Sequence, residues 1–179
     1  MLTQAIIFLA DAVIGFFCIL FLLRFYMQAF RVSFGGAFGH FVISLTNWGV
    51  KPLRRVIPGL MGLDLASLLM AFSLQLVLMV LILGLGRGLD MADGGTLAIM
   101  VIWGALRAVL RLSVYILIGA LILQAVLSWV SPYSPLMGPA SQISRPFLAP
   151  IRRVLPPISG IDLSPLVAIL LAQVVLMFL

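Results

Sequence analysis

Long apolar runs without charged residues alternate along the chain with shorter segments rich in proline, glycine and arginine. The longest uncharged run covers residues 65–85, which is 21 residues. An α-helix rises 1.5 Å per residue, so this run would be about 31 Å long and would match the hydrocarbon thickness of a bilayer. The run therefore predicts a helix that crosses a membrane once.

Two further runs predict spans near the two ends of the sequence. Residues 2–23 are apolar except for short polar interruptions that include Asp11. Because a basic leader and a polar domain after the run are both absent, we interpret this segment as a retained helix and not as a cleaved signal peptide. Residues 163–179 form a shorter run of about 25 Å as a helix.

The remaining apolar stretch is longer than one crossing needs. Residues 96–130 contain no proline, and Arg107 and Arg111 lie in the first half. Two interpretations stay open: an interfacial helix before a span at about 112–130, or one long tilted helix that starts near residue 99. Either way we expect an all-α membrane protein with about four transmembrane helices.

Composition agrees with this hydropathy pattern. Hydrophobic residues make up 64% of the chain, charged residues only 9%, and the mean hydropathy is +1.28. A soluble domain of this size cannot bury so much apolar surface. The net charge of +6 comes from basic residues placed between apolar runs, so we expect contact with membrane lipid and no nucleic acid binding.

A doubled motif divides the chain into two halves. At an offset of 98, residues 52–65 (PLRRVIPGLMGLDL) align with residues 150–163 (PIRRVLPPISGIDL): eight of 14 positions are identical and four exchange Leu and Ile. Gln75 falls on Gln173 at this offset. We therefore expect two membrane repeats, residues 1–86 and 96–179, joined by a linker at 87–95, with spans at about 2–23, 65–85, 99–130 and 163–179.

Two spans per repeat return the chain to its starting side, so the repeats would be parallel and both motif loops would share one side. The two long loops hold eight basic residues: Arg24, Arg31, Lys51, Arg54, Arg55, Arg145, Arg152 and Arg153. The opposite side holds one basic residue, Arg87, or three if Arg107 and Arg111 also lie outside the membrane. This asymmetry predicts cytoplasmic motif loops and periplasmic termini.

The motif also predicts local chemistry. Asp64 and Asp162 directly precede apolar runs, a position typical of helix N-caps. The arginine pairs Arg54-Arg55 and Arg152-Arg153 lie between prolines, which oppose a continuous helix and favour a compact turn. One arginine of each pair could also bond the nearby aspartate. These arginines, with Lys51 and Arg145, are either topology and headgroup contacts or a basic surface for anionic lipid or an acidic partner.

Each motif follows a candidate interfacial helix. In the first loop, apolar residues from Phe38 to Trp48 follow helical spacing after Ser33, a possible cap. The second loop has a weaker, proline-rich counterpart at 135–147. His40 is the only histidine and Cys18 the only cysteine, so we expect neither a metal site nor a disulfide.

Polar residues inside the apolar runs complete the set of candidates. Asp11 and Arg107 are equivalent at an offset of 96, so we predict that Asp11 contacts Arg107 or Arg111; alternatively the arginines reach an interface and Asp11 faces a wet crevice. Gln75 and Gln173 are expected to hydrogen-bond between helices.

The motif as a whole, PLRRVIP…GLDLA repeated as PIRRVLP…GIDLSP, resembles the signature of the YggT/YlmG family. Members are small bacterial and plastid membrane proteins. The resemblance implies links to osmotic stress, to cell division and, in plastids, to attachment of haem to a b-type cytochrome. It does not imply a single shared activity.

Three function classes follow. With no glutamate and single His and Cys residues, acid–base pairs and metal clusters can scarcely be assembled, so we expect no enzyme and no cofactor. The preferred hypothesis is a bacterial inner-membrane scaffold or assembly factor that binds lipid or membrane proteins and that can form a homo-oligomer. The alternative is a small ion or solute channel or transporter in osmotic adaptation.

Overall fold

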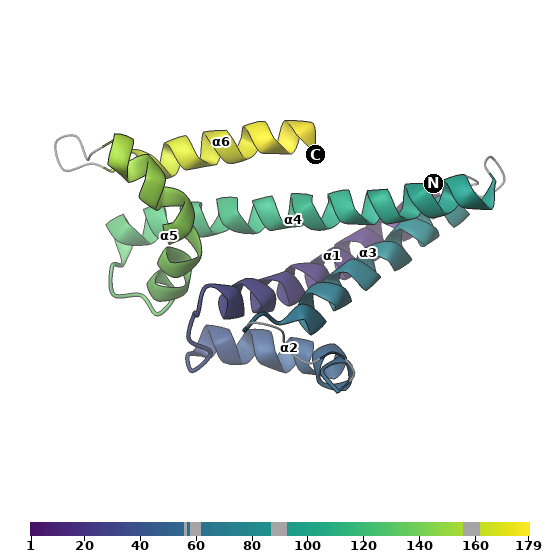
Figure 1. Cartoon of the computed structure of the whole chain (residues 1–179), viewed down its shortest axis with the longest axis horizontal. Coiled ribbons are helices and arrows are strands. Elements are labelled where there is room, and N and C mark those ends of the chain that lie inside the picture. Colours follow the sequence, from purple (N-terminus) through teal and green to yellow (C-terminus); the bar gives the residue numbers. More distant parts are fainter. Residues whose placement is uncertain (56, 58–61, 87–92, 156–161) are drawn as a thin grey trace.

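The computed structural model describes residues 1–55, 57, 62–86, 93–155 and 162–179. These residues form six helices (Figure 1): α1 (Leu2–Ala29), α2 (Ala37–Leu53), α3 (Leu65–Leu85), α4 (Gly94–Val130), α5 (Met137–Val154) and α6 (Ser164–Phe178). The fold of the described chain is therefore all-α, and the order of an apolar helix, a proline-containing helix and a second apolar helix occurs twice.

Three of these helices, α1, α3 and α4, are long and apolar enough to cross a membrane. The fourth predicted span, α6, is apolar but has 15 residues, about 22 Å of helix, which is less than one hydrocarbon thickness. The total of four spans therefore stays a prediction.

The first helix continues six residues beyond its predicted end at residue 23. Its C-terminus lies at Ala29, and Arg31 follows with a positive φ of 56°. The Val32 amide donates to the Met27 carbonyl at 2.7 Å, and the Arg31 amide donates to the Gln28 carbonyl at 3.1 Å. This is a Schellman arrangement, with arginine where glycine is usual. The apolar run ends at Arg24, but the helix does not, because a single charge breaks no backbone hydrogen bond.

The long third stretch is one continuous helix, so the interpretation with a separate interfacial helix was wrong. α4 has 37 residues, about 55 Å, and begins inside the predicted linker. Asp93 caps it, since its carboxylate accepts from the Thr96 amide at 3.3 Å. The rest of the predicted linker, residues 87–92, lies outside the described residues.

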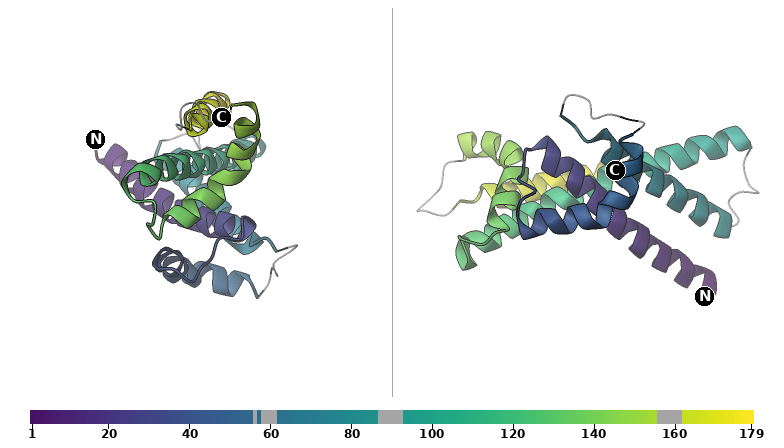
Figure 2. Two further views of the ribbon diagram at one scale, coloured as in Figure 1. Left: turned by 90° about the vertical axis from the view of Figure 1, so that its left-hand side faces the viewer. Right: turned by 90° about the horizontal axis from the view of Figure 1, so that it is seen from below.

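The helices pack in a layered arrangement (Figures 1 and 2). α1 and α4 run in one direction, whereas α3 and α6 run back. α3 packs against both α1 and α4, and α6 packs against α4 and α5. The largest buried cluster joins Phe21 and Leu22 of α1 with Ala71 of α3 and Val109 of α4.

The most deeply buried side of α2 consists of small residues and not of its aromatic residues. The buried positions are Gly39, Val42, Thr46, Gly49 and Val50, whereas Phe41 and Trp48 are exposed. A Cβ atom at Gly49 would lie 2.6 Å from Cε of Met70 and 3.0 Å from Cζ of Phe21. The expected cap Ser33 is not the N-cap, which is Gly36 without a side-chain hydrogen bond.

The prolines beside the arginine pairs were predicted to oppose a continuous helix, and the two copies differ in this respect. In the first copy α2 ends at Leu53, one residue after Pro52, and a turn follows, whereas in the second copy α5 continues through Pro146 and Pro150 to Val154, contrary to the prediction. The prolines that follow the two arginine pairs, Pro58 and Pro156, lie outside the described residues. A proline removes only one backbone donor and usually bends a helix, and α5 is visibly bent in Figure 1. Burial of Ile143 and Leu148 on its inner side helps to hold the bent helix in place.

Candidate functional site

The first motif places a buried carboxylate where α1, α2 and α3 meet. Asp64 is the N-cap of α3, is 1% exposed, and accepts from the backbone N–H and the hydroxyl of Ser67 at 3.4 and 2.6 Å. Arg54 donates to both carboxylate oxygens, from Nε at 3.2 Å and from Nη2 at 2.6 Å. Such a two-point contact fixes geometry as well as charge.

A second arginine, Arg24 of α1, reaches the same carboxylate from the other side. Its Nε lies 3.4 Å from Oδ2 of Asp64, and its Nη1 donates to Thr46 at 2.8 Å and Asn47 at 3.0 Å. Arg24 is 6% exposed. The three helices are therefore joined by one carboxylate that two guanidinium groups share.

Gln28 extends this network by one turn of α1. Its amide oxygen accepts from Nη2 of Arg54 at 3.1 Å, and its amide nitrogen donates to the Gly62 carbonyl at 3.1 Å. We call Arg24, Gln28, Arg54 and Asp64 the motif junction. Removing one partner from such a buried network typically costs several kcal/mol, because a charge is left unpaired.

The charge of Asp64 is kept by its donors. Burial alone would raise the pKa of the Asp64 carboxyl, but hydrogen bonds from Arg54 and Ser67 outweigh it and hold this pKa below its ordinary value. The carboxylate therefore stays ionised at neutral pH, as the pairing with the arginines requires.

The second motif is built on the same pair but is more open. Arg152 donates from Nε to Oδ2 of Asp162 at 2.9 Å, and its Nη2 lies 2.7 Å from the same oxygen. Their side chains are 42% and 36% exposed. Asp162 is not the N-cap of α6, which is Leu163, but it accepts from the Ser164 amide at 3.0 Å.

The difference between the motifs comes from α4. At the offset that aligns Gln28 with Gln124, the partner of Arg24 is Ala120, which has no charge to offer. Gln124 accepts instead from the hydroxyl of Ser144, a residue of α5. Near the second motif, α4 is therefore joined to α5 by a neutral hydrogen bond.

The second arginine of each pair forms no ion pair with the motif aspartate in the described structure. Arg55 and Arg153 are exposed, as are Lys51 at the end of α2 and Arg145 on α5. Within the part of the chain that the structure describes, the ion pairs are Arg24–Asp64, Arg54–Asp64 and Arg152–Asp162. These four cations are thus available to bind anions.

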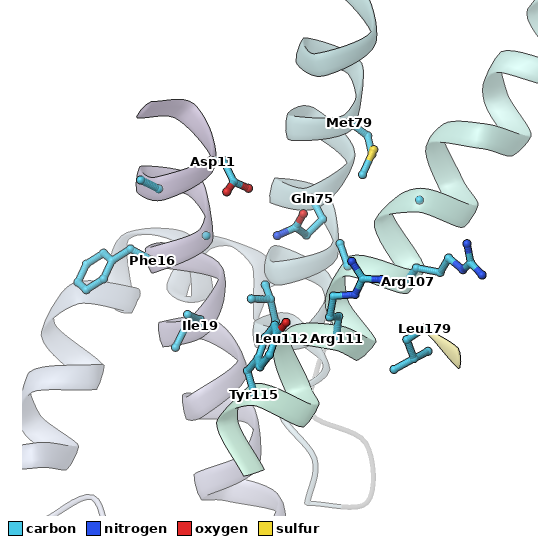
Figure 3. A pocket seen from close by; sticks show the side chains of 14 residues that line it. Asp11, Phe16, Ile19, Gln75, Met79, Arg107, Arg111, Leu112, Tyr115 and Leu179 are labelled. Atoms are coloured by element: carbon cyan, nitrogen blue, oxygen red, sulfur yellow. The ribbon is translucent and has the colours of Figure 1, made fainter. Parts of the chain in front are cut away.

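A second polar region lies between the helices, far from the motifs. A cavity of about 720 Å³ is bounded by α1, α3 and α4 and by Leu179; its polar lining residues are Asp11, Gln75, Arg107, Arg111 and Tyr115. In Figure 3, Asp11 points toward Gln75, the Arg111 guanidinium lies between α3 and α4, and Arg107 points away from Asp11.

Asp11 does not form the expected ion pair with either arginine, since neither comes within 4 Å of it in the described structure. Arg107 instead lies over the ring of Trp103, 5.7 Å from its centroid, a cation–π contact. The three charges share a cavity that is open enough to leave Asp11, Arg107 and Arg111 exposed. The reason is geometric: α1 and α4 diverge along this cavity.

The cavity lies within the apolar lengths of α1, α3 and α4. Asp11 precedes Arg24 by 13 residues and Gln75 follows Asp64 by 11, so both lie about 16–20 Å along their helices from the motif junction. A charged side chain at that depth costs about 2.5–3.5 kcal/mol in a lone helix. Gln75 is 3% exposed, whereas its counterpart Gln173 is exposed.

Other candidates have ordinary surroundings. Cys18 is fully buried, and its thiol donates to the Ala71 carbonyl at 3.4 Å. His40 is exposed on α2. The described residues contain no group of three or more His, Cys, Asp or Glu side chains able to hold a metal ion.

Sequence reasoning missed the role of Arg24, which was counted as a loop cation. It also missed Thr46 and Asn47, which hold the guanidinium of Arg24. A usable signal existed: Arg24 and Gln28 are four residues apart, which places them on one helix face, and Gln28 recurs as Gln124.

Comparison with known proteins places this geometry in a wider group. The CCB3/YggT family model matches residues 3–85 and 103–179. An uncharacterized protein of Pseudomonas aeruginosa is 39% identical over 177 residues, covering 97% of this chain and 87% of the relative. The Escherichia coli (strain K12) protein YggT, also described as uncharacterized, is 35% identical over 170 residues, covering 94% and 85%. No solved structure matches this chain.

Proposed function

The chain belongs to the CCB3/YggT family, and from this premise we propose that it is a non-enzymatic membrane scaffold or assembly factor whose motif loops bind anionic lipid headgroups. The relatives described above carry no enzyme name. The proposal concerns what the two basic motifs do once the helices are in a membrane.

The observation that carries the proposal is the division of labour within each arginine pair. Arg54 and Arg152 are tied to the motif aspartates, whereas Arg55 and Arg153 are exposed beside them. A carboxylate that neutralises one arginine leaves a net positive charge on the other. Basic side chains next to a membrane-spanning helix attract anionic lipid, at about 1 kcal/mol each.

The first copy adds an aromatic anchor to this charge. Trp48 is 58% exposed, and Lys51 follows it by three residues on the same face of α2. Arg55 lies two residues beyond the end of α2. Trp48 also packs edge-on against Phe17 and Phe21 of α1 at 6.0 and 5.8 Å. A fixed tryptophan beside two cations suits the boundary between headgroups and acyl chains.

Quenching of Trp48 fluorescence by brominated lipid tests the proposal. The protein with Trp103→Phe and Trp129→Phe is reconstituted in vesicles in which brominated phosphatidylglycerol replaces phosphatidylcholine stepwise. We expect quenching at low mole fraction of the anionic lipid, and about tenfold weaker selectivity after Lys51→Gln with Arg55→Gln, because two cations are lost. His40→Gln on the same helix is the control and should leave selectivity unchanged.

Equal quenching by brominated phosphatidylcholine and phosphatidylglycerol would reject lipid recognition. If a protein instead co-purifies in mild detergent, and is lost with Arg55→Gln and Arg153→Gln, the basic loops bind an acidic partner and not lipid.

The remaining parts of the proposal follow from the basic loops. We place the chain in the bacterial inner membrane with the motif loops in the cytoplasm, since basic loops are retained on that side. Osmotic stress and cell division are the physiological settings that the family resemblance suggests for such a scaffold.

A second candidate function rests on the cavity. A space of about 720 Å³ with Asp11, Gln75 and two arginines at mid-depth is typical of ion or solute pathways. Ion flux in proteoliposomes that disappears with Asp11→Asn or with Gln75→Leu would favour a transporter. Absence of flux in intact protein would leave the scaffold.

A further inference from the structure

Among the described residues, two opposite charges that line the cavity have no ion-pair partner. Asp11 and Arg107 are both exposed, and both line the same open cavity from different helices. Charges inside membrane proteins almost always pair with one another or face the bundle interior or a water-filled cavity. Within the described chain Asp11 and Arg107 form no ion pair with each other, and Arg107 points away from Asp11 (Figure 3).

Asp11 and Arg107 also lie at one depth. They line a single cavity, they occupy equivalent positions at an offset of 96, and α1 and α4 run in the same direction (Figure 1). A helix rises by 1.5 Å per residue, so equal spacing from Gln28 and Gln124 along helices that run in the same direction places the two residues at comparable distances from those glutamines.

We propose that a second copy of this chain closes the cavity, with Asp11 of each copy paired to Arg107 of the other across a two-fold axis along the membrane normal. Rotation about such an axis keeps every residue at its depth. It also brings the α1 wall of the cavity in one copy opposite the α4 wall in the other copy, and this contact occurs twice in the interface. Each copy thereby supplies the charge that the other lacks.

The surroundings of the two charges fit this arrangement. Asp11 lies on a face of α1 with the exposed apolar side chain of Phe8, which is three residues before it and 70% exposed. Arg107 lies on an α4 face with Met100, Trp103 and Leu110, which are 52%, 56% and 44% exposed. Apolar surface faces lipid at no cost, so the charges, and not the apolar area, select the partner. A second copy carries both complementary charges at the required depth.

Charge reversal with mixing tests the proposal, because the dimer makes an unusual prediction. Asp11→Arg alone places two arginines opposite each other at both contacts, and Arg107→Asp alone does the same with two carboxylates. A mixed dimer of the two variants is complementary at both contacts. We expect two chains per particle for the intact protein in nanodiscs, about tenfold or greater weakening of association for each variant alone, and recovery when the two variants are co-reconstituted.

Mass photometry with a different tag on each variant gives the readout. Arg145→Asp, which reverses an exposed charge on α5, is the control and should keep two chains per particle. A single chain per particle for the intact protein would overturn the proposal, as would two chains in both single variants or a mixture that stays monomeric. A pair formed within one chain predicts that last result.

Cross-linking covers the case in which a reversed charge prevents insertion. With Cys18→Ser as background, copies carrying Asp11→Cys and copies carrying Arg107→Cys are co-expressed and oxidised. A cross-link that joins the two tags supports the dimer. A second preparation carries Asp11→Cys and Arg107→Cys in the same copy. A cross-link that forms only within one copy of this double variant, or no cross-link in either preparation, contradicts the dimer.

Discussion

Asp64 and Asp162 occupy matching positions in the two motifs but have different surroundings. Asp64 is buried and shared by Arg24 and Arg54, whereas Asp162 is paired with Arg152 at the surface. The strength of an ion pair depends on burial and on what remains when one partner is removed. The two aspartates should therefore differ sharply in their effect on stability.

We expect Asp64→Asn to lower the free energy of unfolding by roughly 3–5 kcal/mol, because it leaves Arg24 buried without a counter-charge. Asp162→Asn should cost less than about 1 kcal/mol, because its pair is exposed. Unfolding in detergent, followed by far-UV circular dichroism, measures both, and Asp162→Asn is the matched control. Equal losses in the two variants would contradict this assignment.

Acidification provides a check on the same assignment. The pKa of the Asp64 carboxyl is lowered in the folded protein, since the donors Arg54 and Ser67 outweigh burial, which raises it. Its stabilisation is therefore complete above the ordinary carboxyl pKa of about 3.9 and is lost as pH falls through the lower pKa of the folded state. The difference in the free energy of unfolding between the intact protein and Asp64→Asn should shrink over that acidic range and should stay constant near neutral pH.

At the scale of helices, α2 is held by the closeness of its backbone to α1 and α3. Gly49 lies against Met70 and Phe21, and the buried side also includes Val42 and Thr46. Thr46 is the acceptor for Arg24, so the position of α2 also determines the geometry of the motif junction. Packing and the polar network depend on each other here.

Gly49→Ala should destabilise the protein by about 1 kcal/mol, because the new Cβ would lie 3.0 Å from Cζ of the fully buried Phe21, whereas Cε of Met70 ends a flexible side chain and can move aside. Gly119→Ala in α4 is the control, since a Cβ there meets no atom within 4 Å; alanine should be neutral or slightly stabilising in that helix. The same unfolding measurement compares them. A neutral Gly49→Ala variant would show that α2 packs more loosely than described.

At the scale of the whole molecule, direction is the informative property. α1 and α4 run in one direction, and α3 and α6 run in the opposite direction (Figure 1). The connection from α1 to α3, which holds Arg55, and the connection from α4 to α6, which holds Arg153, therefore lie at corresponding ends of their helix pairs. Asp93, at the start of α4, belongs to the opposite end of the α3–α4 pair. This arrangement makes a prediction about the two sides of a membrane.

Single cysteines in the Cys18→Ser background at Arg55, Arg153 and Asp93 should report two sides. We expect an impermeant maleimide to label Asp93→Cys in intact spheroplasts, and to label Arg55→Cys and Arg153→Cys only after permeabilisation. Labelling of positions 55 and 153 from opposite sides would refute the parallel repeats and the shared motif side.

Several features could be predicted from the sequence alone because they depend only on the order and spacing of residues along the chain. The α3 boundaries equal those of the uncharged run at 65–85, since hydropathy and length need no knowledge of neighbouring helices. The bond between one arginine and the motif aspartate, which the sequence raised as a possibility, is present in both copies; the two residues are only ten apart in sequence, so few arrangements of the intervening segment needed to be considered.

Tertiary structure decided which of the similar residues are buried and paired. Arg24 joins the first junction, while Ala120 leaves the second without a counterpart. Likewise Asp11 and Arg107 share a cavity without touching. Burial and pairing depend on the distance and direction between helices that are far apart in sequence. Spacing along one chain determines which residues share a helix face, but not which second helix that face meets.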